Sequence, residues 1–177
     1  MAEAPATAQS HVRPIWKMLA SESAVYGVVL VSGLLIIVAN KSDTEPVAIL
    51  LKVLGTAVIF WLAHVYAGAV SHLADEPDAE SSTADRLAAA IRHSLENLWG
   101  MLAAPVVPAV ALGASAVGLV SSEQAIWGTL WVNVALLAVL GYRGVSRWSD
   151  RIWVRLVGAL VTAGFGLVLV LLKALIH

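Results

Sequence analysis

The sequence predicts an all-α membrane protein, built as a bundle of five transmembrane helices. Only 13% of the residues are charged and 59% are hydrophobic, whereas about 25% of an average soluble domain is charged. The mean hydropathy is +0.83. The charges are also clustered, and the stretches between them approach the ~20 residues needed to cross a hydrocarbon core. These uncharged stretches cover residues 23–40, 53–74, 97–122, 124–142 and 156–172.

The predicted domain organisation is a single transmembrane domain over residues 13–177, because the residues outside the apolar stretches are too few for a soluble domain of ordinary size. Residues 1–12, which are rich in alanine and threonine, are expected to be disordered. Residues 73–84 are expected to form a cytoplasmic acidic linker. The predicted spans cover about 23–40, 47–72, 99–121, 125–142 and 155–176.

An amphipathic helix at about 85–98 is predicted before the third span. Its apolar residues recur at spacings of three and four, which is the helical period; they are Leu87, Ile91, Leu95, Leu98 and Leu102. Pro105 and Pro108 then follow within the third span. Each proline removes an amide donor, so this span is predicted to be kinked or interrupted. Small residues in spans three and five, including Gly113 and Gly118, favour close helix packing.

The distribution of lysine and arginine predicts a cytoplasmic N-terminus and an external C-terminus. With that orientation, eight of the eleven basic residues lie inside: Arg13, Lys17, Arg86, Arg92, Arg143, Arg147, Arg151 and Arg155. The other three, Lys41, Lys52 and Lys173, lie outside. The expected location is the bacterial inner membrane.

His64 is the most informative ionisable residue in the predicted spans. The midpoint of span two is near Val58, so a rise of ~1.5 Å per residue places His64 roughly 9 Å to the cytoplasmic side of the middle. An imidazole cannot reach the headgroups from that depth and is expected to face protein or water. One interpretation is a neutral ring bonded to a backbone carbonyl or a neighbouring hydroxyl. The other is a titrating group that lines a permeation path or senses pH.

Four further residues are candidates for the same polar path: Tyr26, Tyr66, Lys52 and Asn133. Tyr66 points away from the helix face that His64 occupies. Lys52 lies toward the outer side, from where its butyl stem can extend to the headgroups. Asn133 lies near the centre of span four, and a buried amide in a membrane more often ties helices together than binds substrate.

The basic segment after span four is the candidate for contact with lipid or a partner. Arg143, Arg147, Arg151 and Arg155 recur every four residues, which predicts a stripe that touches anionic headgroups of the inner leaflet. Arg92 and His93 are candidates for the same kind of contact. The expected partners are therefore the bilayer, its anionic inner-leaflet lipids and further copies of the chain.

Several function classes are not expected. The chain has no cysteine and a formal net charge of −1, so thiol chemistry is excluded and nucleic acid is not expected as a partner. No P-loop, HExxH, G-x-S-x-G or pair of carboxylates on a membrane face is present. No catalytic residue, metal site or cofactor is therefore predicted, and the protein is not expected to be an enzyme.

Two segments, "VYGVVLVSGLL" at 25–35 and "FWLAHVYA" at 60–67, followed later by "RHS" at 92–94, resemble a family of small bacterial multi-pass integral membrane proteins. The resemblance covers spans one and two well and the rest loosely. The family has no known activity to transfer. The resemblance implies only that His64, Tyr66, Tyr26 and His93 are the first residues to test.

Two functions follow as expectations. The first is a homo-oligomeric, pH-responsive channel or passive transporter in which His64 titrates. The second is a non-transporting scaffold or assembly subunit that docks a partner through residues 73–97 and the Arg143–Arg155 segment. Flux through reconstituted protein would favour the first, and partner capture that depends on residues 75–97 would favour the second.

Overall fold

The computed structural model describes residues 22–40, 45–75 and 82–176, and every regular element within these ranges is an α-helix. The elements are α2 (Glu22–Ala39), α3 (Pro46–Asp75), α4 (Thr83–Asn97), α5 (Trp99–Ala103), α6 (Val106–Ala116), α7 (Ser122–Val145) and α8 (Ile152–Ile176). Five helical segments are long and apolar enough to cross a membrane, with α5 and α6 together forming the third. The predicted class is confirmed to this extent. The predicted disordered N-terminus and half of the acidic linker, residues 76–81, lie outside the described residues.

The amphipathic helix and the interrupted third span are both present. The amphipathic helix is α4, whose N-terminus is capped by the side chain of Ser82, which accepts a hydrogen bond from the Asp85 amide. The third span breaks between α5 and α6 at Pro105. This is the position where a missing amide donor is expected to end a helix.

α6 ends earlier than residue 121, where the third span was predicted to end. Gly118 has a φ of +78°, a left-handed conformation that glycine adopts without steric cost. The Leu119 amide bonds to the Ala114 carbonyl and the Gly118 amide to the Ser115 carbonyl, which is the Schellman pattern of helix termination. Three residues later, Ser121 and Gln124 form a reciprocal capping box that starts α7.

The core of the bundle lies around α2, which packs against α3, α5, α7 and α8. Its buried side chains are Val28, Val31, Leu35 and Ile36, and they meet Val53 of α3, Leu112 of α6, and Leu130 and Leu137 of α7. Within a membrane such contacts stabilise through van der Waals packing, since lipid tails are as apolar as leucine. The outward faces of α3 and α8 carry large exposed apolar side chains, for example Leu160 at 71% exposure. These faces suit contact with lipid.

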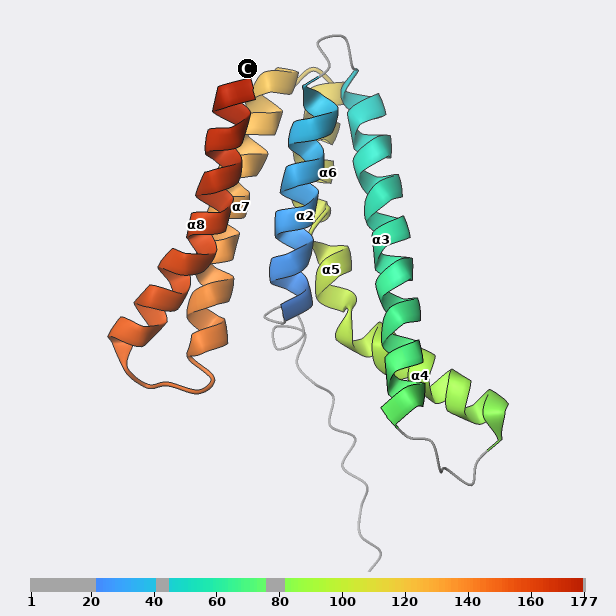
Figure 1. The fold of residues 1–177 in the computed structure, drawn as a ribbon. Helices are drawn as coiled ribbons and strands as arrows, with labels where there is room; N and C mark the ends of the chain where they lie inside the picture. The colour runs from blue at the N-terminus through green and yellow to red at the C-terminus, as the bar shows by residue number, and fades with distance from the viewer. Residues whose placement is uncertain (1–21, 41–44, 76–81, 177) are drawn as a thin grey trace, which may run out of the picture.

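The bundle is tapered (Figure 1). At the end where α2 begins, α3 and the α7–α8 hairpin lie far apart, and at the opposite end the helices converge. α4 and the α7–α8 turn both lie at the wide end. The described arginines belong to these elements and their neighbours, so they gather at the wide end, whereas Lys173 lies in the last turn of α8 at the narrow end. One end of the bundle is therefore the basic end, and its cytoplasmic location remains a prediction.

Candidate functional site

The strongest candidate site is formed by Tyr26 of α2 and His64 of α3. Their rings lie 5.0 Å apart between centroids, at an angle of 45°. The Nδ1 atom of His64 is 2.9 Å from the Phe60 carbonyl oxygen, one turn earlier in the same helix. A carbonyl only accepts, so Nδ1 carries the hydrogen of this bond and Nε2 is the ring nitrogen without it.

This pair lies beside the interruption of the third span. A Cβ atom on Gly27 would lie 2.9 Å from the Met101 Cα and 3.1 Å from the Ala104 Cβ, so α2 contacts the broken segment through the residue that follows Tyr26. Because Pro105 and Pro108 have no amide hydrogen, the carbonyls of Met101 and Ala104 lose their usual helical donors. One of these carbonyls, that of Met101, would lie 3.2 Å from a Cβ atom on Gly27, the residue that follows Tyr26.

A second polar atom of α3 lies one turn before His64. The indole Nε1 of Trp61 is buried and has no hydrogen-bond partner among the described residues. A buried N–H without an acceptor is costly, and such groups in membrane helices often mark functional surfaces or contacts with a further polar partner.

The other candidates for a polar path do not join this pair. Tyr66 is 73% exposed and Lys52 is also exposed on α3. Asn133 is buried in α7, where its Nδ2 donates to the Ser32 hydroxyl of α2 over 2.8 Å. Ser32 in turn donates to the Val28 carbonyl over 2.7 Å. Asn133 thus links α2 to α7, while its Oδ1 is buried without a partner in the described chain.

The junction of α3 and α4 holds a second pair of rings. His72 and His93 stack with centroids 4.8 Å apart and an interplanar angle of 14°. A Cβ atom on Gly68 would lie 2.8 Å from the Oγ of buried Ser94, so the glycine allows α4 to approach α3. Arg92, the other candidate of this segment, is exposed and pairs with Glu96 over 3.1 Å.

The predicted arginine stripe extends over the turn between two helices. α7 ends at Val145 and α8 begins at Ile152, so Arg147 and Arg151 lie in the turn between them. Arg155 bonds to the Ser149 carbonyl and to the Asp150 carboxylate, each over 2.8 Å, and these bonds close the turn. The four regularly spaced arginines therefore do not share one helix. Arg143 lies in α7, Arg155 lies in α8, and the other two lie in the turn that joins these helices.

Two features of α8 had little indication in the sequence, the burial of Lys173 and the hydrogen bond of Thr162 to α7. Lys173, expected at the outer surface, is only 3% exposed. Thr162 of α8 donates to the Leu137 carbonyl of α7 over 2.7 Å, and it does so where Gly141 and Gly158 bring the two backbones together. The stretch "GALVTAGFG" predicted close packing here, but it did not identify the partner helix. In contrast, Gly113 and Gly118 have no side chain or foreign backbone within reach of a Cβ.

The chemistry that this arrangement supports is proton binding and hydrogen bonding. Among the described residues, no group of three or more potential ligands could hold a metal ion. Comparison of the chain with protein-family models, curated proteins and solved structures gave no match. The architecture is that of a small helical integral membrane protein, and its function has to be inferred from the site itself.

Proposed function

We propose that the protein is a homo-oligomeric, pH-responsive channel or passive transporter whose polar lining includes Tyr26 and His64. The observation that carries the proposal is the position of this pair. Tyr26 is 45% exposed and His64 is half-buried, although both belong to helices that can span a membrane. Ionisable side chains within spans almost always face a bundle interior or a water-filled cavity.

The depth of the pair supports this reasoning. Tyr26 lies four residues after the start of α2, which corresponds to about 6 Å along the helix. The phenol and imidazole are therefore inside the span, on a surface that one subunit leaves partly open. A second copy that covers this surface would enclose the pair and supply the polar environment that lipid lacks.

The hydrogen bond of His64 supports a role in proton binding. Because Nδ1 donates to the Phe60 carbonyl, the ring is oriented and Nε2 is the free basic nitrogen. An imidazole ordinarily changes charge between about pH 5 and pH 8. The adjacent Tyr26 ring lies within the ~6 Å over which an aromatic face attracts a cation, so the pair can accommodate the charged ring.

Flux measurements in liposomes test the transport function. Proton and alkali-cation flux should exceed that of empty liposomes and should change across about pH 5 to 8. His64→Ala should remove the pH dependence, whereas His93→Ala, which alters a histidine outside the pair, should retain it. Flux equal to that of empty liposomes, or an identical profile in His64→Ala, would refute the proposal.

Cross-linking tests the oligomer. The natural chain has no cysteine, so single-cysteine variants report contacts without background. Ala67 is exposed one turn after His64, and Ala135 is exposed on α7. Oxidation in membranes should cross-link Ala67→Cys much faster than Ala135→Cys. Equal rates would show that the surface around His64 is not where copies meet.

A second candidate is a non-transporting scaffold, which the surface of α4 favours. Leu87 and Ile91 are 46% and 38% exposed, and they lie one turn apart on the helix that α3 holds at the basic end. A pull-down with the full chain and with a variant lacking residues 75–97 tests this candidate. Capture of a partner that requires the segment, together with an absence of flux, would favour the scaffold.

A further inference from the structure

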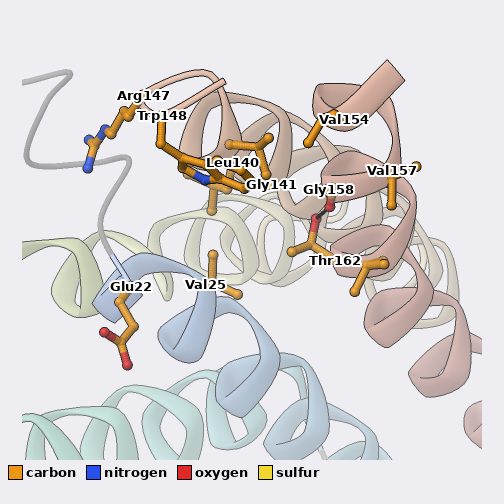
Figure 2. A pocket seen from close by; sticks show the side chains of 13 residues that line it. Glu22, Val25, Leu140, Gly141, Arg147, Trp148, Val154, Val157, Gly158 and Thr162 are labelled. Carbon is orange, nitrogen blue, oxygen red and sulfur yellow. Dashed lines mark hydrogen bonds between the residues drawn. The ribbon is translucent and has the colours of Figure 1, made fainter. Parts of the chain in front are cut away.

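A groove lies between α2 and the α7–α8 hairpin (Figure 2), and neither Tyr26 nor His64 lines it. Its volume is about 560 Å³, within the ~300–1,000 Å³ typical of ligand sites. Its walls are aliphatic and come from three helices: Val25, Leu140, Val154, Val157 and Val161. Figure 2 shows Val25 of α2 across from Leu140 and Gly141 of α7.

Three glycines line the groove: Gly141 and Gly144 of α7 and Gly158 of α8. Gly141 and Gly158 hold α7 and α8 in close contact, since a Cβ on either would meet the backbone or side chains of the other helix. Gly144, one turn further along α7, also lines the groove, but a Cβ there would meet nothing within 4 Å. The space in front of Gly144 is therefore open rather than filled by a neighbour.

The mouth of the groove is at the basic end. Arg147 and Glu22 both lie at this mouth (Figure 2), together with Trp148. Trp148 is 73% exposed, and tryptophan is typical of the level where lipid headgroups meet hydrocarbon. Arg151 in the same turn and Arg143 in the last turn of α7 are also exposed. Asp150 in this turn is paired with Arg155, so the three other arginines exceed the carboxylate of Glu22.

The groove extends from this charged level into the apolar part of the bundle. Its α8 wall runs from Val154 to Thr162, which corresponds to about 12 Å along a helix. A ligand that fits has an anionic group at the mouth and an aliphatic chain along the walls. We infer that this groove binds one anionic phospholipid, with an acyl chain against the valines and the phosphate beside Arg147.

Native mass spectrometry of the full chain in detergent tests this inference, with added phosphatidylglycerol, phosphatidylethanolamine or phosphatidylcholine. Phosphatidylglycerol should bind at least several-fold more tightly than the two zwitterionic lipids. Arg147→Gln should weaken its binding about five-fold, which corresponds to the ~1 kcal/mol of one basic residue near an anionic surface. Arg143→Gln is the matched control, because it removes the same charge from a residue four positions before Arg147 that does not itself line the groove, and it should change binding less.

A second pair of variants tests the groove itself. Gly144→Leu should occlude it and abolish the tight adduct. Gly128→Leu is the matched control, because Gly128 is on the same helix, also has open space around it and does not line the groove. If Gly144→Leu does not fold, as judged by its thermal transition, the comparison of the Arg147 and Arg143 variants still tests whether the groove binds an anionic lipid.

Three results would overturn the inference. The first is equal binding of the three lipids, which would remove the anionic preference. The second is unchanged phosphatidylglycerol binding in both Arg147→Gln and a folded Gly144→Leu. The third is a change of subunit number in Gly144→Leu without loss of lipid, which would show that a second copy occupies the groove.

Discussion

The close contact between α7 and α8 predicts that a glycine-to-alanine substitution changes stability in opposite directions at two positions of α7 that are one turn apart. Gly141→Ala places a methyl group against Thr162 Oγ1 and the Gly158 carbonyl. Gly144→Ala places the same group in open space. Both changes remove the cost of a glycine within a helix, which is up to about 1 kcal/mol.

The magnitudes follow from what each methyl group meets. At Gly141 one obstacle is backbone, so the helices have to separate, and overpacking of this kind costs about 1–3 kcal/mol. Separation also weakens the hydrogen bond from Thr162 to the Leu137 carbonyl, a type of contact worth roughly 0.6 kcal/mol in a membrane protein. We expect Gly141→Ala to be destabilised by about 1–2 kcal/mol and Gly144→Ala to be unchanged or more stable by up to about 1 kcal/mol.

The assay is reversible unfolding of the purified protein in mixed micelles, followed by circular dichroism as the fraction of denaturing detergent rises. The difference between the two variants should be about 1–3 kcal/mol. A Gly141→Ala protein as stable as Gly144→Ala would contradict the packing described for these helices. Gly141→Ser would then be needed to establish whether the interface accepts any added atom.

Three further predictions concern stability and local structure. Ser32→Ala should cost about 1–3 kcal/mol of stability in the same unfolding assay, because it leaves the buried Asn133 amide unpaired. The double variant Ser32→Ala, Asn133→Leu should be more stable than Ser32→Ala alone, and equal stability of the two would contradict this reason. Gly118→Ala should cost about 1–2 kcal/mol because its φ is +78°, and the loss should be smaller for Gly118→Asn. Gly68→Leu should detach α4 and make it more sensitive to limited proteolysis, whereas Gly55→Leu, on the same helix in open space, should not.

The helical architecture was predictable because charge and proline mark its boundaries. Lysine, arginine, glutamate and aspartate stand between the apolar stretches, so the ends of α2 and α8 lie within a few residues of the predicted spans. Pro105 marks the interruption of the third span for a purely local reason. Gly118 was also a local indication that α6 ends early. The apolar stretch continues beyond this glycine, and the predicted span was therefore extended too far.

The site was less predictable because it depends on how helices dock. His64 was recognised from its depth, and its bond to the Phe60 carbonyl was among the expected contacts. Its neighbour is Tyr26 rather than Tyr66 or Asn133, since α2 packs beside this face of α3 while Asn133 faces α2 from the other side. The arginine spacing matched a helical period within a segment that turns. No spacing rule distinguishes those two cases.

The taper of the bundle has a consequence for the surrounding bilayer. The splayed ends of α3 and the α7–α8 hairpin, together with α4, lie at one end (Figure 1), so the protein occupies more lateral area in one leaflet than in the other. An amphipathic helix at the same level adds to this difference, and binding of such helices depends on curvature. In a curved membrane the wide end of the bundle is accommodated best in the leaflet whose headgroups are less tightly packed. Membrane curvature can therefore influence where the protein accumulates.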